Sequence, residues 1–458
     1  MSASAFQVQF PLSKTRKIPV VGAFDAGAVS SDGGLILLRQ IDAKIGLVQR
    51  LAQRLNDPRQ QSKVKQSVED MVRQRVFGIC LGYEDCNDFD TLCADPAFKV
   101  AAGRLPVTGA DLASQPTLCR FENSVGRKEL RALMGAMVEQ FIAAHPTASR
   151  IVLDFDATDD PTHGQQELEF FHGYYGCHCY LPLLVFATVD DKPEQHLICA
   201  VLRPGNKHAG HRTVSVLKRI VKRVREVYPQ VSLTLRGDAG FASPEVYDYC
   251  EKAEVDYVLS LARNKRLEAM AEPILTMARA QCAETGQKSR LFDEVSYAAE
   301  SWPHERRVIV KAEVMPKFGD NPRFVVTNIA RFQVDADAVY EFYTRRGDVE
   351  NRIKEVKNDL AADRTSCHRF VANQFRLILH AAAMQLMQAL RGLLAGTEMA
   401  RLQSGTLRVK LLKVGVRVVQ SCRRIWLGLP TSYPYQTLWE KIWQRLTEQP
   451  APAIQTAS

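Results

Sequence analysis

The chain has 458 residues, of which 46% are hydrophobic, so it is long enough for two or three domains. Its 60 Lys and Arg residues outnumber 51 Asp and Glu residues, and this net charge of +9 suits a polyanionic partner without requiring one. No apolar run approaches the length of a membrane span, which argues against a membrane protein.

The cysteines and the N-terminus point to a cytoplasmic protein. Eleven cysteines are scattered without a Cys-x-x-Cys pair, a pattern typical of reduced thiols rather than of a disulfide framework. The first ten residues lack the basic and apolar regions of a signal peptide. We therefore expect a cytosolic chain.

The N-terminal third has helical periodicity. After an extended basic arm over residues 1–20, apolar residues recur at intervals of three and four over 35–55, 65–81 and 127–144. The links between these segments are polar or carry proline. Residues 1–148 are therefore predicted to form a helical domain.

A buried strand ending in acids follows. Residues 151–155 are mostly apolar and lead into Asp154-Phe-Asp156-Ala-Thr158-Asp159-Asp160, whose four carboxylates would repel one another without a cation. Asp156 is the first candidate ligand, with Asp154 as its main substitute because it shares the strand face.

The pattern from residue 150 predicts an α/β fold. Strands are expected at 151–155, 181–189 and 197–202, then a helix at 213–227, a strand at 233–235, a helix at 244–253 and a strand at 257–261. The fourth of these strands ends in Gly237-Asp238-Ala-Gly240, which places Asp238 at the strand edge where open α/β sheets usually carry their chemistry. The Cys177-His178-Cys179 run is too tightly spaced for an ordinary zinc site and is better explained by packing.

Residues 265–335 interrupt this order with three alternating, strand-like segments at 291–297, 306–314 and 323–327. Trp302 lies between the first two segments. It either packs in the core of this insertion, which we favour, or stacks on an unpaired base.

The most informative stretch is Tyr343-Thr-Arg-Arg346-Gly-Asp-Val-Glu350, which continues to Lys357. At about 100° per residue, a helix brings Tyr343, Arg346, Glu350 and Lys357 within roughly 60° of one another. An apolar stripe lies roughly 80° away; it consists of Phe342, Val349, Ile353, Val356 and Leu360. A carboxylate between two cations suits a metal site that grips phosphates, although a solvated amphipathic face is the alternative.

The C-terminal region begins with an apolar helix predicted over 370–390. Seven basic residues and no acid then occupy 401–424, which favours a surface that faces DNA or a partner. These are Arg401, Arg408, Lys410, Lys413, Arg417, Arg423 and Arg424. The Pro/Ala/Thr-rich tail over 448–458 is predicted to be disordered.

The three acidic motifs together resemble the blocks of bacterial insertion-sequence transposases of the Asp-Asp-Glu (DDE) class. The last block is similar to the Tyr-Arg-Glu-Lys signature of the cut-and-paste group, and the run from Asp154 through Phe171-His-Gly-Tyr-Tyr175 most resembles the insertion-sequence thirteen-eighty family. The resemblance implies a ribonuclease-H-like catalytic core over 149–365, with a β-strand insertion at about 265–335. It also implies a DNA-end-binding domain over 1–148, and a mainly helical region over 366–447 for dimerisation or DNA contact.

The resemblance also implies a mechanism. Asp156, Asp238 and Glu350 would be catalytic residues that hold two Mg²⁺ ions, with Mn²⁺ as a substitute and Asp156 bridging the pair. Arg346 and Lys357 would grip phosphates, and Tyr343 and Trp302 would contact displaced DNA.

The implied partners are double-stranded DNA, as terminal inverted repeats and target, and a second copy of the chain on DNA. The implied location is the bacterial cytoplasm, at the nucleoid when DNA is bound. A plain metal-dependent nuclease of the same fold and a non-catalytic DNA-binding descendant of a transposase are the rival functions.

Overall fold

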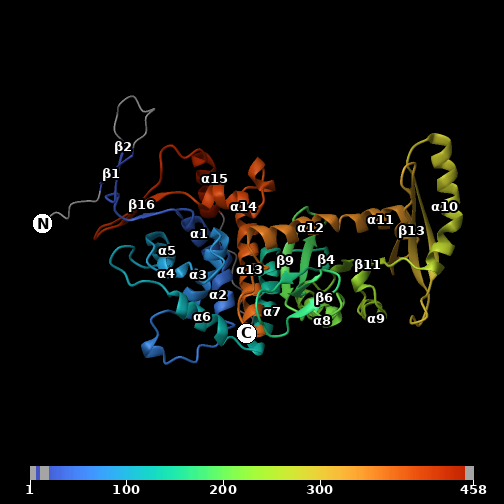
Figure 1. Cartoon of the computed structure of the whole chain (residues 1–458), viewed down its shortest axis with the longest axis horizontal. Coiled ribbons are helices and arrows are strands. Elements are labelled where there is room, and N and C mark those ends of the chain that lie inside the picture. Colours follow the sequence, from blue (N-terminus) through green and yellow to red (C-terminus); the bar gives the residue numbers. More distant parts are fainter. Residues whose placement is uncertain (1–6, 11–19, 449–458) are drawn as a thin grey trace. The chain divides into compact units, whose positions relative to one another are not determined.

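The computed structural model describes residues 7–10 and 20–448, so most of the predicted basic arm and all but the first residue of the predicted disordered tail lie outside the described residues. Its internal contacts divide the chain into two units. The first comprises Met1–Glu122 with Leu386–Ser458, and the second comprises Asn123–Gln385. Both units mix helices and strands, whose labels appear in Figure 1.

The first unit is built from both ends of the chain. Its helices are α1 (Leu35–Ile45), α2 (Leu47–Ala52), α3 (Val68–Leu81), α4 (Phe89–Leu92), α5 (Pro96–Ala101), α6 (Gln115–Ser124, entering the second unit), α14 (Ser404–Leu407) and α15 (Gln436–Glu448). Its strands are β1 (Gln7–Phe10), β2 (Val20–Ala23), β3 (Val29–Ser30), β16 (Val416–Gln420) and β17 (Ile425–Gly428). Because β16 pairs with β3, the two chain ends share one small sheet.

This pairing differs from the expected domain boundaries. The boundary expected at residue 148 falls inside the second unit, because α7 (Arg127–Ala144) packs on β9 (His196–Val201) and α8 (Thr213–Val227). The boundary expected at 366 falls there too, since α13 (Phe370–Gly392) lies mostly in the second unit. The apolar side chains of α13 are largely buried, and a role for this region in dimerisation or DNA contact stays a prediction.

The basic stretch over 401–424 is only partly a free surface. Arg401, Arg417, Arg423 and Arg424 are exposed. Lys413 instead forms an ion pair with buried Asp32, 2.8 Å from Nζ to Oδ1, and the Arg408 Nε donates to the carbonyl of Cys80. Some of these charges therefore stabilise the first unit.

A nine-stranded sheet forms the second unit. Its order is β12-β13-β15-β11-β10-β4-β8-β9, with β14 (Gly319–Asp320) on β13. The other bounds are β12 (Ser289–Tyr297), β13 (Arg306–Met315), β15 (Arg323–Thr327), β11 (Asp256–Leu261), β10 (Ser232–Gly237), β4 (Arg150–Ala157) and β8 (Leu183–Val189). β4 lies parallel to β10 and antiparallel to β8. The predicted order was three strands, a helix, a strand, a helix and a strand. It is confirmed by β4, β8, β9, α8, β10, α9 (Pro244–Lys252) and β11, in that order.

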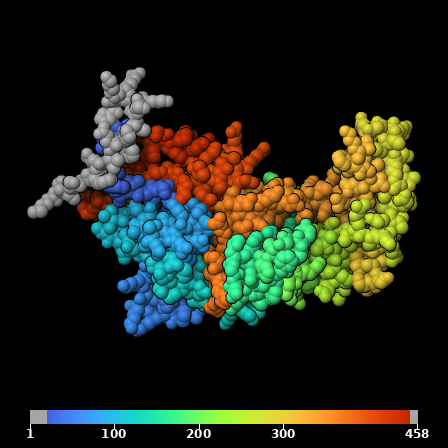
Figure 2. Space-filling view, viewed as in Figure 1, coloured from blue at the N-terminus to red at the C-terminus, as the bar shows by residue number. Residues whose placement is uncertain are grey.

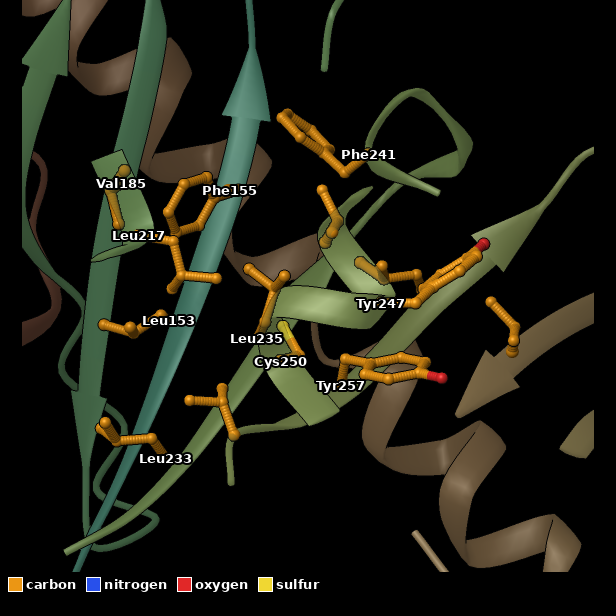
Figure 3. Packing of buried hydrophobic residues seen from close by; sticks show 14 of the residues in the cluster. Leu153, Phe155, Val185, Leu217, Leu233, Leu235, Phe241, Tyr247, Cys250 and Tyr257 are labelled. Atoms are coloured by element: carbon orange, nitrogen blue, oxygen red, sulfur yellow. The ribbon is translucent and has the colours of Figure 1, made fainter. Parts of the chain in front are cut away.

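The core of this unit fixes which way β4 and β10 face. Leu153 and Phe155 of β4 and Leu235 of β10 point into one apolar cluster, where the rings of Phe155 and Phe241 lie edge to face at 6.1 Å (Figure 3). Because successive side chains in a strand alternate, Asp154 and Asp156 point to the opposite face. Apolar packing on one face thus orients the acids on the other.

The predicted insertion extends the sheet. Its last strand, β15, pairs antiparallel with β11, and β13 and β12 follow outward. Helix α10 (Lys265–Thr285) packs on β12 and β13 and was not among the predicted elements. Figure 2 shows residues of this insertion forming one end of the second unit. The buried residues Leu267, Ala271, Leu275, Ala278 and Cys282 of α10 do follow helical spacing.

Candidate active site

Parallel pairing brings two of the three candidate acids to one sheet edge. Asp156 is the penultimate residue of β4, and Asp238 directly follows β10. Phe155 pairs with Gly237, so the next residues along, Asp156 and Asp238, lie at the same level at this edge of the sheet. The Asp238 Oδ1 accepts a hydrogen bond from the Gly240 amide at 2.8 Å, and a Cβ at Gly240 would lie 2.6 Å from that of Ala209. The Gly-Asp-Ala-Gly motif therefore fixes the loop that carries the second acid.

Glu350 comes from a broken helix rather than a single one. The predicted helix over 343–357 is instead α11 (Ala336–Thr344), a turn at Arg345 and Arg346, α12 (Gly347–Lys354), and a π-helical turn at Glu355–Asp359. The predicted apolar stripe nevertheless holds at Val349, Ile353, Val356 and Leu360, which are all buried. These residues seat the segment, while the Glu350 side chain remains 53% exposed. Single π turns occur often at functional sites.

The three acids line one pocket of about 730 Å³. Arg346 and Lys357 line it too, as does Lys354. β4, the loop after β10 and the Glu350 segment thus contribute to a single concave site. The sequence motifs and the family resemblance together had named all three acids, Arg346 and Lys357 as site residues.

The four acids of the first motif have different partners. Asp154 is fully buried and pairs with Arg236, whereas Lys357 Nζ lies 2.8 Å from Asp159 Oδ1. Asp160 accepts a hydrogen bond from the Thr365 hydroxyl at 2.8 Å, and burial raises the pKa of Asp160 to about 7. Protein cations and burial thus separate carboxylates that the sequence showed only as a cluster, and Asp154 is removed from the pocket.

Arg346 joins two of the candidate acids. Its Nη1 donates to Asp156 Oδ2 at 2.7 Å, and its Nη2 donates to Glu350 Oε1 at 3.2 Å. Burial raises the pKa of Asp156 to about 7 even though Arg346 acts to lower it, and the charges of Asp238 and Glu350 raise the pKa further. A cation beside Asp156 therefore offsets both the cost of burying this carboxylate and its repulsion by the other acids.

The remaining two predicted site residues do not line this pocket. Tyr343 is half-buried, with its ring 6.0 Å from that of Tyr340. Trp302 packs edge to face against Tyr247 at 5.0 Å and Tyr297 at 5.4 Å. Core packing, the favoured alternative for Trp302, accounts for this position; DNA contacts by either residue remain predictions.

Aromatic and histidine side chains complete the pocket. His172, Tyr174, Tyr175 and His208 line it and were not among the predicted site residues. The run Phe171-His-Gly-Tyr-Tyr175 was noted only as a family resemblance. The signal in the sequence that could have pointed to these residues was a cluster of aromatic side chains in a short polar loop.

The donor set of the pocket fits a divalent metal. Three carboxylates supply the hard oxygen ligands that Mg²⁺ takes, and the crowding of acids around Asp156 favours a compact dication. In residues 7–10 and 20–448, however, no three His, Cys, Asp or Glu side chains already form a metal-holding group. Arg346 accounts for part of this, because it lies between Asp156 and Glu350.

Three carboxylates and two cations at one α/β sheet edge suit an enzyme that acts on phosphodiesters. A family model described as transposase DDE domain group 1 matches residues 11–451, so the chain belongs to this family of DDE transposases. No curated protein matches the chain. Membership in this family implies DNA as the partner. Across the described residues, no helix is both long and apolar enough to cross a membrane.

Proposed function

We propose that this transposase cleaves DNA at the ends of an insertion sequence and transfers the freed 3′-hydroxyl into target DNA. The observation that carries the proposal is that Asp156, Asp238 and Glu350, from three separate elements, line one pocket with Arg346 and Lys357. A ribonuclease-H-like core is supported by the order β9-β8-β4-β10-β11, antiparallel from β9 to β4 and parallel from β4 to β11.

The three acids would hold two Mg²⁺ ions, or Mn²⁺ in their place. When bound, such ions supply an activated oxygen nucleophile and neutralise charge on the leaving oxygen. The chain itself holds the acids on one sheet edge and places Arg346 and Lys357 beside them. In the complex with DNA, these two cations would exchange their carboxylate partners for phosphate oxygens.

Finer assignments belong to the same proposal. The spacing of Tyr343, Arg346, Glu350 and Lys357 supports the cut-and-paste group and the thirteen-eighty family within it. The first unit is a candidate for binding element ends, because Lys63 and Lys65 line a groove there, together with Arg59. Two ends must be held at once, so we propose a dimer on DNA.

A strand-transfer assay tests the function. Given a pre-cut end with a free 3′-hydroxyl, Mg²⁺ and a target plasmid, the protein is expected to join the end to the plasmid. Cleavage without joining would favour the plain nuclease. DNA binding without either reaction would favour the non-catalytic descendant.

Replacing the pocket cations is expected to separate phosphate binding from metal binding. Arg346→Ala and Lys357→Ala should slow strand cleavage, since each removes a phosphate-binding charge. Mg²⁺ should still bind, and should bind more tightly in Arg346→Ala without DNA, because the guanidinium no longer occupies Asp156 and Glu350. Calorimetry with Mn²⁺ and single-turnover cleavage measure the two effects.

Salt dependence and a conservative variant are the controls for the cations. A phosphate role predicts a smaller defect at low salt, where electrostatic attraction is stronger. Arg346→Lys should rescue cleavage only partly, because it restores the charge without the planar fork. A defect that is indifferent to salt and accompanied by a lower Tm would instead assign these cations to holding Asp156 and Asp159 in place.

A further inference from the structure

A small aromatic hairpin stands beside the acids. Its strands β6 (Phe170–His172) and β7 (Cys177–Tyr180) form a three-stranded sheet with β5 (Asp160–Pro161), apart from the main sheet. The turn between β6 and β7 carries Tyr174 and Tyr175, and both line the pocket of the three acids. Tyr174 is 86% exposed, so most of its ring is open to a ligand.

Hydrogen bonds anchor the base of the hairpin, so the exposed ring of Tyr174 is carried by a held structure. At its base, the Tyr180 hydroxyl donates to the Glu167 carbonyl at 2.7 Å, and the Glu167 amide donates to the carbonyl of His368 at 2.9 Å. Gln166 Nε2 donates to the carbonyl of Thr365 at 2.8 Å. The chain that follows the Glu350 segment therefore holds the base of the hairpin.

Contacts among its aromatic rings brace the turn itself. Tyr175 lies 4.9 Å from His172 and meets Tyr174 edge to face at 5.0 Å and 88°. Burial raises the pKa of Tyr175 to about 12, and the charges of Asp159, Asp156 and Asp238 act in the same direction. The half-buried Tyr175 thus faces the acids and supports the exposed ring of Tyr174.

The charges in the pocket select a phosphate-bearing occupant over an apolar peptide. Lys354, Lys357 and Arg346 line the same pocket as Tyr174. An aromatic face beside cations suits a nucleotide, whose base stacks while its phosphate pairs with the charge. A base inside an intact duplex already has both faces covered, so an unpaired base is the form that Tyr174 can bind.

On the basis of the proposed function, we propose that Tyr174, supported by Tyr175, stacks on an unpaired base of the element end beside the scissile phosphate. This contact holds the DNA strand over the acids. It is a substrate-binding role, separate from metal binding, because neither ring supplies a carboxylate to the site.

Fluorescence of 2-aminopurine tests the contact. The base is placed in turn at each of the last few positions of a pre-cut end, and the protein is added with Ca²⁺ to prevent reaction. Wild-type protein should quench the probe at one position. Tyr174→Ala should abolish this quenching and weaken end binding about 5- to 150-fold, the range for loss of one base–aromatic stack. Tyr174→Phe and Tyr174→Trp should retain both.

Phe318→Ala is the matched control, since Phe318 is also an exposed ring, 80% accessible, but lies next to β14 in the insertion and does not line the pocket. It should leave quenching and affinity unchanged. Persistent quenching and affinity in a folded Tyr174→Ala would overturn the stacking role while leaving cleavage by the wild type intact. Absence of end binding and cleavage by the wild type itself would instead reject the proposed function.

Discussion

Asp156→Asn, Asp238→Asn and Glu350→Gln are each expected to lower cleavage of element ends at least about a thousandfold. Each variant keeps the shape of the side chain and removes a charge from the pocket that these acids share. Metal catalysis is worth several kcal/mol of transition-state stabilisation, and about 4 kcal/mol corresponds to a thousandfold in rate. Binding of end DNA should be largely unchanged, because none of the three acids attracts phosphate.

The same helical turn provides a matched control. Asp348 lies two residues before Glu350 in the first turn of α12, is exposed, and does not line the pocket. Asp348→Asn should therefore cleave at the wild-type rate, whereas Glu350→Gln should not. Single-turnover cleavage of a labelled end, with gel-shift affinity measured in parallel, gives both quantities. Wild-type cleavage by any one of the three variants would remove that residue from the catalytic set.

The sequence predicted the acids because their motifs are local. An apolar strand that ends in Asp156, a strand that ends in Gly237-Asp238, and a stripe that seats Glu350 each follow from nearest-neighbour patterns. That the first two acids meet followed from family resemblance, since adjacency of β4 and β10 depends on tertiary pairing. The pairing of Arg236 with Asp154 could not be predicted from the sequence pattern either, because it depends on which strands lie side by side.

Breaks within elements were harder to predict than the elements themselves. Nothing in the heptad-like spacing from Phe342 to Leu360 distinguishes one continuous helix from α11, α12 and a π turn. The aromatic hairpin was missed for another reason. Its strands are short and its residues alternate poorly, so propensity gives no clear signal and tertiary anchoring by the segment around Thr365 decides the structure.

Arg236→Met is expected to lower stability most among the substitutions near the site. The guanidinium holds Asp154 at both oxygens, at 2.6 and 2.9 Å, and both side chains are almost fully buried. Removing one partner leaves a buried charge without compensation, which typically costs about 3–5 kcal/mol. For a unit of this size, that corresponds to a Tm lower by roughly 10 °C.

Arg236 also connects the elements that carry the three acids. It lies within β10 two residues before Asp238, pairs across to β4 two residues before Asp156, and donates from Nη1 to the Phe342 carbonyl at 2.7 Å. That carbonyl lies in the last turn of α11, where helix carbonyls lack an intrahelical donor. The ring of Phe342 also lies under the guanidinium, at 4.9 Å. One side chain thus fixes the start of the Glu350 segment against both strands.

A double variant separates the positioning role from stability. Replacing a buried ion pair by apolar residues is often neutral, so Asp154→Leu with Arg236→Met should recover most of the lost Tm. It cannot restore the hydrogen bond to Phe342, and cleavage should stay about 10- to 100-fold low, as is typical when residues supporting a metal site are lost. The Mg²⁺ concentration that gives half-maximal cleavage should also be higher for the double variant than for the wild type.

Arg306→Met is the control for an indirect effect of instability. Arg306 is buried in the same unit and pairs with Glu251 at 2.8 Å, but it does not line the pocket of the acids. This variant should lower the Tm while leaving the Mg²⁺ midpoint unchanged at temperatures well below unfolding. Wild-type cleavage and Mg²⁺ dependence in the double variant would show that the Asp154–Arg236 pair contributes to folding alone, because the acids would then be held correctly without it.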